Sequence, residues 1–425
     1  MTTPTERLRT TFHVALSSYW FTTHMLWGVL MTYTVAVIVK ATASANPAQL
    51  TGNILGIGSI AAIVVPLLVG PMSDRCLSHL GRRRPFMLTG TIMSIVGLAG
   101  IGFAAHQLSI PLLVLGYLIT NLGNNIATAA YSGLIPDLVP MDQRGTASGF
   151  MAALSQLGTL LGLIAGAFLG KVHQVPMLMA LLAVILGLSL VATMTMVKET
   201  AITEAPPAIP PSKMLASLWE PMKHNDFRWV WITRALVVMG FYCIQPFLIF
   251  FSADVLRGSD PSKTTLLLGA SVIVCASVSG LVGGMLGDRH GRKRIVIWAN
   301  SLMAIICVGF AIATTVPTAI VAAAIFGLAY GAYYSVDWAL GSDVLPNHAD
   351  AGKDMAVWHI AMTLPQAVAA PLAGQMIAAF GSTQVQRGGE MVTSYPHAGY
   401  VTLFLVAGLF TGAGAVLLRK VRGST

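Results

Sequence analysis

Twelve stretches of about 20 or more mostly apolar residues recur along the chain, and each is long enough to cross a bilayer as a helix. Of the 425 residues, 55% are apolar and only 10% are charged, and the mean hydropathy is +0.74. Such a composition excludes an ordinary soluble globule. We predict an all-α integral membrane protein with twelve transmembrane helices near residues 14–39, 49–72, 85–105, 110–137, 145–170, 176–197, 228–253, 264–287, 295–314, 318–344, 353–380 and 398–418.

Two loops repeat nearly the same pattern. One reads SDRCLSHLGRRRPF (residues 73–86) and the other GDRHGRKR (residues 287–294). Each follows the second long apolar stretch of its half and carries Asp-Arg, then Gly, then a run of basic residues. A pattern that recurs in this way indicates an internally duplicated membrane protein, which favours transport.

The duplication extends to a second pair of segments and defines the predicted halves. YSGLIPDLVP ends the fourth predicted helix and SVDWALGSDVLP ends the tenth, so that Asp137 aligns with Asp343. Between the halves the apolar pattern stops and PPAIPP appears, which is typical of a linker. We therefore predict two six-helix pseudo-repeats at residues 1–197 and 228–425, joined by a cytoplasmic linker at residues 198–227.

The basic residues orient the predicted helices. If both termini are cytoplasmic, nineteen Lys and Arg residues lie on that side and five on the other, with Arg234 inside a helix. The net charge of +9 is then explained by topology and by contact with anionic membrane lipid, and no nucleic-acid partner is expected. The first apolar stretch is too long for a cleavable signal peptide. We expect a multi-pass protein of the cell inner (plasma) membrane.

Several functional classes lack their sequence signals. No GxxxxGK[ST] loop is present for a nucleotide-driven pump, and no Cys/His cluster has metal-ligand spacing. The four cysteines lie in apolar segments or a cytoplasmic loop, so we expect free thiols. No soluble catalytic domain can be recognised. We expect neither an enzyme nor a bound cofactor or metal.

With its twelve predicted spans, central linker and repeated loops, the chain resembles the major facilitator superfamily. Seven positions separate Asp74 from Gly81 in the first loop, whereas three separate Asp288 from Gly291 in the second. The longer form is similar to the loop of sucrose transporters and of the related glycoside, pentoside and hexuronide cation symporters. In the fourth helix this chain has Asn121 where sucrose transporters carry a buried aspartate. The resemblance implies a secondary transporter with alternating access.

The resemblance also implies a gate at the repeated loops. There the aspartates hold the ends of neighbouring helices through arginine pairing and helix dipoles, which stabilises the outward-facing state. The alternative is that the arginines only anchor the loops to lipid headgroups. The candidate gating residues are Asp74, Arg75, Gly81, Arg82, Arg83, Asp137, Arg144, Asp288, Arg289, Gly291, Arg292 and Asp343.

Substrate candidates come from helices one, four, seven and ten, which line the cavity in the family that this chain resembles. Aromatic faces together with neutral hydrogen-bonding groups suit an uncharged, polyhydroxylated ligand. Any single Asn or Tyr among them is also explained as a hydrogen-bond partner between helices. With two tryptophans from helices ten and eleven, the candidates are Trp27, Asn121, Asn124, Asn125, Tyr242, Gln245, Tyr330, Tyr334, Trp338 and Trp358.

Ionisable residues inside spans are more informative, because each costs about 3 kcal/mol at the bilayer centre unless it is paired or hydrated. Asp337 is the one carboxylate clearly within a predicted span. Arg234, Asp337 and His359 each lie about 9 Å along their helices from the cytoplasmic boundary. We hypothesise that Asp337 pairs with Arg234 and that protonation of Asp337 or His359 couples a proton to substrate movement. The alternative is a permanent structural ion pair. His24 is a second candidate proton site.

Small residues in the fifth predicted helix permit close helix packing. Gly158, Gly162, Gly166 and Gly170 recur every four residues there, and the eighth predicted helix has a similar stripe at Ala276, Gly280, Gly284 and Gly287. The resemblance implies that helices five and eight face each other across the halves, so we expect these stripes at their seam.

Taken together, these patterns predict a monomeric, proton-coupled importer of a small-molecule substrate, namely a sugar or glycoside. Two alternatives remain open at the level of sequence. One is a proton-coupled exporter of amphipathic drugs or natural products, since methionines and aromatic residues are numerous in the spans. The other is a sensor that binds a solute without moving it.

Overall fold

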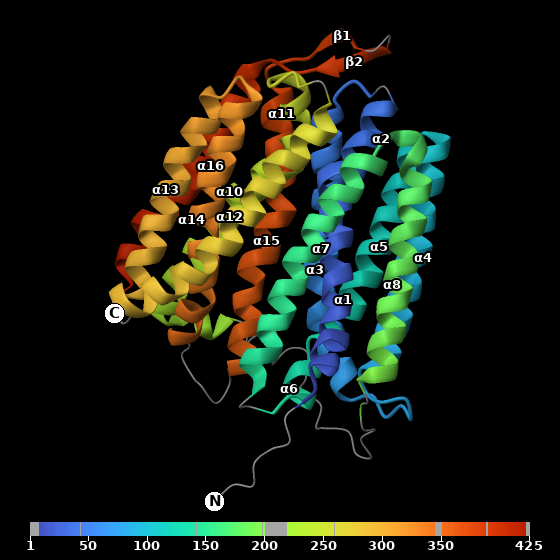
Figure 1. The fold of residues 1–425 in the computed structure, drawn as a ribbon, viewed down its shortest axis with the longest axis vertical. Helices are drawn as coiled ribbons and strands as arrows, with labels where there is room; N and C mark the ends of the chain where they lie inside the picture. The colour runs from blue at the N-terminus through green and yellow to red at the C-terminus, as the bar shows by residue number, and fades with distance from the viewer. Residues whose placement is uncertain are drawn as a thin grey trace, which may run out of the picture. The chain divides into compact units, whose positions relative to one another are not determined.

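The computed structural model of the chain describes residues 8–42, 44–140, 143–197, 199, 219–258, 260–344, 351–387 and 390–421, with the side chains at 135–136, 144–145, 338, 342, 351–356, 359, 387 and 390 excepted. Within these residues, 12 helical segments are long and apolar enough to cross a membrane (Figure 1). The predicted all-α membrane architecture is therefore confirmed. Most of the predicted linker at residues 198–227 lies outside the described residues.

The contacts divide the chain into two compact units, with boundaries at Thr42, Gly56 and Pro207. The first part of α3 thus groups with the second unit. The helices of the first unit, with α3 shared, are α1 (Thr10–Val29), η1 (Leu30–Thr34), α2 (Val35–Ala41), α3 (Pro47–Asp74), α4 (Arg84–Gln107), α5 (Ile110–Tyr131), α6 (Leu134–Leu138), α7 (Arg144–Leu169), η3 (Val172–Gln174) and α8 (Val175–Met196).

The second unit contains the remaining helices and one small sheet. Its elements are η4 (Pro221–Lys223), α10 (Asn225–Ile244), η5 (Gln245–Phe247), α11 (Leu248–Asp254), α12 (Pro261–His290), α13 (Arg292–Ile312), α14 (Val316–Asp343), α15 (Ala351–Ala378), β1 (Thr383–Arg387), β2 (Glu390–Ser394), α16 (His397–Leu417) and η7 (Leu418–Lys420).

The first span contains a turn of π-helix, η1, between α1 and α2. Such a turn inserts one extra residue into the helical repeat and often marks functional positions. The periodicity of apolar residues does not reveal it, because both flanking segments remain helical. Spacing of three and four therefore relates side chains within α1 but not from α1 to α2.

The glycine stripe of α7 packs against α1. A Cβ added at Gly162 would lie 2.5 Å from the carbonyl oxygen of Met25, and one at Gly158 would overlap the carbonyl of Phe21. These glycines therefore bring two helices of the same unit into backbone contact. The expectation that this stripe lies at a seam between the halves was wrong, because spacing reveals close packing without identifying the neighbour.

The fourth predicted helix ends earlier than expected. It was predicted to continue to residue 137, but α5 ends at Tyr131 and the short helix α6 follows after a turn. Gly133 lies in this turn, and a Cβ there would overlap the guanidinium of Arg83. Glycine weakens helices, and here it also makes room for a buried arginine.

The segment between the last two predicted helices, residues 381–397, contains an antiparallel hairpin of β1 and β2, in which Thr383 pairs with Ser394 and Val385 with Val392. The hairpin lies at the end of the second unit opposite the C-terminus (Figure 1). All four cysteines are free thiols in the structure, as expected.

Candidate functional site

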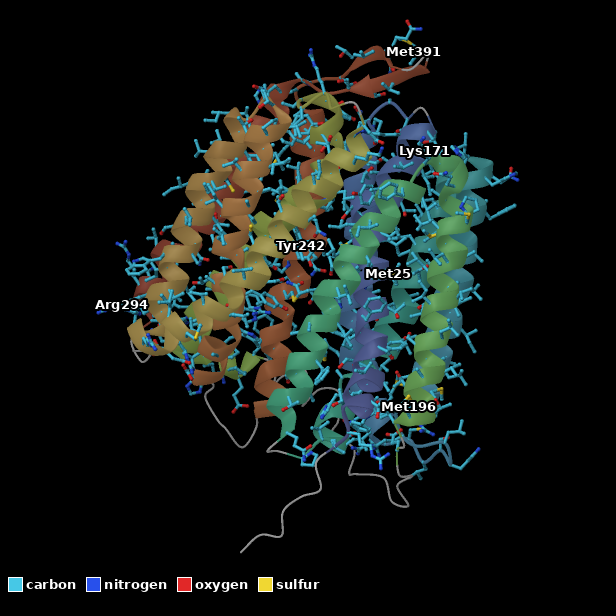
Figure 2. All side chains as sticks on the ribbon, in the orientation of Figure 1. Met25, Lys171, Met196, Tyr242, Arg294 and Met391 are labelled. Carbon is cyan, nitrogen blue, oxygen red and sulfur yellow. The ribbon has the colours of Figure 1, made fainter. Side chains whose placement is uncertain are left out.

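The second unit contains a narrow, partly open pocket. Figure 2 places Tyr242, one of its lining residues, between Arg294 near one end of the unit and Met391 on the hairpin at the other. The lining comes from α10, α14 and α15 and consists of Arg234, Val238, Phe241, Tyr242, Tyr330, Tyr333, Tyr334, Asp337 and Met362.

One ion pair lies in the wall of this pocket. The guanidinium of Arg234 on α10 donates a hydrogen bond to the carboxylate of Asp337 on α14, and each side chain is only 4% exposed. The pairing expected from sequence is therefore present. Desolvated charges of this kind are tolerated only when they are paired, because an isolated buried charge is very costly.

Two further side chains surround the guanidinium of Arg234. Its Cζ atom lies 4.8 Å from the ring centroid of Trp358, a cation–π contact. Its Nη2 donates to the sulfur of Met362 at 3.9 Å, while its buried Nε has no hydrogen-bond partner among the described residues. Trp358 is 0% exposed. The structure thus places Trp358 behind Arg234 and not on an accessible wall of the pocket.

Stacked aromatic rings form the other wall. The rings of Phe241 and Tyr330 are 4.7 Å apart with an interplanar angle of 15°. Tyr334 is the most open of the group, at 53% exposure. Tyr333 is buried, and its hydroxyl has no hydrogen-bond partner among the described residues. The pocket therefore combines flat apolar faces with tyrosine hydroxyls, of which that of Tyr333 is buried and unpaired among the described residues.

Three of the residues predicted from the sequence either do not line this pocket or have side chains outside the described residues. Gln245 begins the turn η5 and is half-buried, but it is not a lining residue. The side chains of Trp338 and His359 lie outside the described residues. The predicted contribution of His359 to the ion pair therefore stays a prediction.

In the first unit, a polar cluster joins α1 to α5. Trp27 Nε1 donates to Asn124 Oδ1 at 3.1 Å, and Asn125 Nδ2 donates to Asn121 Oδ1 at 2.9 Å. Asn124 is 2% exposed, and its Nδ2 has no hydrogen-bond partner among the described residues. Asn124 thus keeps an unused amide donor next to the indole of Trp27.

His24 lies one turn before Trp27 on α1. Its Nδ1 is 3.0 Å from the carbonyl oxygen of Trp20, and the two rings are 5.0 Å apart. No carboxylate of the described residues forms an ion pair with His24. The imidazole of His24, a candidate proton site, therefore bonds to the backbone of its own helix.

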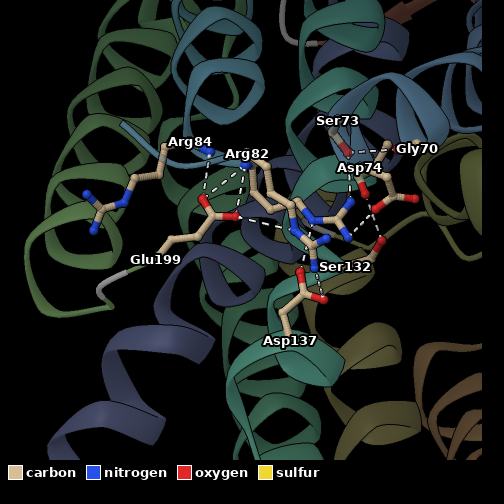
Figure 3. Close-up of polar contacts among 10 residues, drawn as sticks. Gly70, Ser73, Asp74, Arg82, Arg84, Ser132, Asp137 and Glu199 are labelled. Carbon is tan, nitrogen blue, oxygen red and sulfur yellow. Dashed lines mark hydrogen bonds and ion pairs between the residues drawn. The ribbon is translucent and has the colours of Figure 1, made fainter. Parts of the chain in front are cut away.

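At the loop between α3 and α4, arginines and acidic side chains form a dense network (Figure 3). Arg83 pairs with Asp74 and with Asp137, and its Nη1 donates to Ser73 Oγ at 2.7 Å. Arg82 pairs with Asp137 as well. The side chain of Arg83 is only 8% exposed. These four ion-paired residues thus form one cluster around a buried Arg83 that joins the ends of α3, α4 and α6.

Glu199, just after α8, completes this network and was not among the sequence candidates. Its carboxylate accepts hydrogen bonds from the backbone N–H of Arg83 at 3.0 Å and of Arg84 at 3.4 Å. In return, Arg84 donates to the carbonyls of Met194 and Val197, at 2.7 Å each. The start of α4 and the end of α8 therefore cap each other. A lone Glu after an apolar stretch offered no signal beyond its charge.

The second loop repeats the arrangement in a more open form. Arg292 donates to Asp343 at 2.7 Å and to Asp288 at 3.5 Å. Its side chain is 32% exposed. The glycine before the basic run has a positive φ in both copies, 106° at Gly81 and 91° at Gly291. Both loops therefore require glycine for their backbone conformation.

Three further gating candidates are Arg75, Arg289 and Arg144. Arg75 and Arg289 are exposed at their loops. The side chain of Arg144 lies outside the described residues. Whether these residues help to gate the protein remains a prediction.

The sequence matches the profile of the Major Facilitator Superfamily over residues 16–280 and 257–424. It is similar to the sucrose transport protein SUC4 of Arabidopsis thaliana, with 25% identity over 390 residues that cover 76% of each chain. The sucrose transport protein SUT2 of Oryza sativa subsp. indica is 26% identical over 400 residues, which cover 76% of this chain and 79% of that protein.

Solved structures share the fold. The crystal structure of the nucleoside transporter NupG matches with a TM-score of 0.67 at 15% identity, over 96% of this chain and 97% of that one. A D-xylose-proton symporter matches with a TM-score of 0.69 at 17% identity, over 97% of both chains. At these identities the likeness concerns the fold alone.

Proposed function

The chain belongs to the Major Facilitator Superfamily of membrane transporters, and from this premise we propose that it moves a sugar or glycoside across the membrane by proton-coupled symport. The buried Arg234–Asp337 pair in the wall of an aromatic pocket carries the proposal. Similarity to sucrose transport proteins supports the choice of substrate class.

The chemistry of the pocket supports an uncharged, hydroxylated ligand. A sugar ring has C–H faces that pack on flat rings such as Phe241 and Tyr330, and its hydroxyls require donors and acceptors such as Tyr333. The Trp27 and Asn124 pair of the first unit offers the same combination of a ring and an amide. Charged groups of the pocket are already engaged with each other, which disfavours a strongly ionic substrate.

Asp337 is the proposed proton carrier. Arg234 stays charged under all physiological conditions, so a change in the pair must come from the carboxylate. Protonation of Asp337 removes its negative charge and weakens its hold on the guanidinium. The freed Arg234 then has donors for a substrate hydroxyl, while Trp358 keeps the guanidinium in place through the cation–π contact. Proton binding and substrate binding thus favour the same arrangement.

The ion-pair networks at the two loops would control access to the substrate site as the transporter alternates between its states. Arg83 and Arg292 each fasten helix ends to two carboxylates, and release of these pairs would let the helix ends move. In the orientation that the basic residues favour, both loops and both termini are cytoplasmic. We further propose that the protein works as a monomer in the cell inner (plasma) membrane, with membrane lipid and protons as its other partners.

Export of an amphipathic compound is the second candidate, because Val238, Phe241 and Met362 give part of the pocket an apolar lining. Unbranched Met side chains adapt to irregular ligands. The direction of substrate flux under an imposed proton gradient separates this candidate from import.

The test is charge movement and uptake in proteoliposomes that hold the purified protein, with a panel of mono- and disaccharides. We expect a saturable current that increases with an inward proton gradient. Asp337→Asn should abolish gradient-driven uptake while it leaves exchange of labelled against unlabelled substrate intact. Asp260→Asn, a carboxylate at the start of α12 and away from the pocket, is the matched control. Equal loss of uptake and exchange in folded Asp337→Asn would instead assign the pair a structural role. No current with any sugar would reject sugar symport.

A further inference from the structure

A second buried carboxylate, Asp254, lies twelve residues after Tyr242 and is not among the residues that line the transport site proposed above. It ends α11 in the second unit, at the same end as the hairpin, and is 6% exposed. Its Oδ2 accepts a hydrogen bond from the hydroxyl of Tyr400 at 2.6 Å and another from the backbone N–H of Tyr395 at 3.1 Å. Asp254 therefore fixes the segment between the hairpin and α16.

Tyr395 continues this network to α3. Its hydroxyl accepts a hydrogen bond from the backbone N–H of Ala48 at 3.0 Å. Ala48 is the second residue of α3, where backbone N–H groups have no partner within the helix. Tyr395 thus caps the start of α3 with a side chain that lies 347 positions away in the sequence. Tyr395 is 3% exposed, and Ala48 and Tyr400 are 0% exposed.

The same part of α3 packs closely on α15. A Cβ added at Gly374 of α15 would lie 2.5 Å from the carbonyl oxygen of Ala48. One added at Gly52 of α3 would overlap the carbonyl of Ala370. The contact is therefore mainly between backbones, and the ring of Pro371 packs at Gly56. Groups at the end of this contact help to decide whether it stays closed.

We propose that Asp254, Tyr395 and Tyr400 form a clasp that holds the start of α3 on α15, and that this clasp releases when the carrier opens at the hairpin end. The inference rests on the proposed transport function, because only a protein that alternates between states needs a releasable contact here. The three residues are positioning residues and touch no substrate. The segment at residues 381–397 then has a function, which is to place Tyr395 at the start of α3.

The chemistry of the clasp suits repeated release. Burial raises the pKa of the Tyr395 hydroxyl above its ordinary value of 10.0, so the group stays neutral at physiological pH. Release exchanges one neutral hydrogen bond to Ala48 for one to water, so it changes the free energy little. The stronger, charge-assisted bonds to Asp254 keep Tyr395 in position for the next closure.

The test is the rate at which one buried thiol reacts with maleimide in lipid nanodiscs, where both faces of the protein are accessible. The four native cysteines are replaced by Ser, and Thr51→Cys on α3, at a position that is 0% exposed, is the reporter. Ala370→Cys on α15, at 2% exposure, is the second reporter and replaces the first if that variant does not fold. Gly374→Leu forces α3 away from α15, so its labelling rate is the reference for a separated contact.

Tyr395→Phe keeps the ring and removes only the acceptor for Ala48, so we expect labelling to accelerate about fivefold, which corresponds to about 1 kcal/mol. Asp254→Asn should accelerate it at least as much. Thr393→Val, a hairpin position away from the clasp, should leave the rate unchanged. The proposal is overturned if Gly374→Leu accelerates labelling and neither clasp variant does. Since labelling needs no substrate, absence of sugar flux would reject the proposed function without touching this result.

Discussion

Arg234 and Asp337 reach each other from α10 and α14 and form an ion pair that is almost completely removed from solvent. Their separation in sequence is 103 residues. The contact therefore depends on the packing of the whole second unit, and any change to one partner leaves the other as an uncompensated charge in a low-dielectric interior.

The first prediction concerns the stability of this pair. Asp337→Leu and Arg234→Met as single variants should each lower the free energy of unfolding by about 3–5 kcal/mol, because each leaves one buried charge unpaired. The double variant should recover most of that loss, since both charges are gone. Thermal unfolding of the purified protein measures all three. A double variant as unstable as the sum of the singles would show that the two residues act independently.

Gly341 provides a test of the ring behind Arg234. A Cβ at this position of α14 would lie 2.6 Å from the Cε2 and Cζ2 atoms of Trp358. Gly341→Ala should therefore displace the indole and cost about 1–3 kcal/mol of stability. Gly341→Ala combined with Trp358→Phe should recover part of the loss, because the smaller ring leaves room for the methyl group. If Gly341→Ala unfolds at the same temperature as the natural protein, the packing described for Trp358 is incorrect.

The aromatic wall should determine substrate affinity. Phe241→Leu removes the ring stacked on Tyr330 and should raise the KM for the transported sugar about tenfold, a loss of about 1.4 kcal/mol of binding. Tyr330→Phe keeps the stack and removes one hydroxyl. Initial uptake rates over a range of sugar concentrations distinguish the two effects. An unchanged KM in both variants would place the substrate elsewhere.

Glu199 should protect a native thiol. Glu199→Gln removes the charge that caps the start of α4 and should cost about 0.5–2 kcal/mol of local stability. Cys76 lies in the adjoining loop and is half-buried, as is Cys275 in α12, which is replaced by Ser for this test, while Cys243 and Cys307 are buried. Alkylation of Cys76 should therefore accelerate in Glu199→Gln and not in Glu220→Gln, a control beyond the network. Equal alkylation rates would mean that the reciprocal caps do not hold this loop.

The sequence predicted best those features whose signal is strong and local. Twelve apolar stretches specified the spans, and the rarity of charge inside them singled out Arg234 and Asp337. Duplication of the loops correctly paired Asp137 with Asp343, each of which binds the basic run of its own half. These inferences succeed because burying charge or backbone in lipid is so costly that few arrangements remain.

The failures share a different cause. Gly158 and Gly162 indicated close packing, but only the structure identifies α1 as the neighbour. Glu199 and Tyr395 act through backbone N–H groups that lie more than 100 positions away. Contacts of this kind produce no periodic pattern in the sequence, so the sequence alone does not predict them. The insertion between Asp74 and Gly81 was visible, yet its consequence was not: Arg82 and Arg83 share the contacts that Arg292 makes alone.

That difference between the two loops leads to the last prediction. Arg83 is 8% exposed and bound to Asp74, Asp137 and Ser73, whereas Arg292 is 32% exposed. Arg83→Gln should therefore cost several times more stability than Arg292→Gln, about 3 kcal/mol against about 0.2–1 kcal/mol. High salt should reduce the stability loss of Arg292→Gln by a larger fraction than that of Arg83→Gln, because a buried guanidinium is screened less than an exposed one. Thermal unfolding at low and high ionic strength measures both. Equal losses in the two variants would mean that the longer first loop gives Arg83 no special structural role.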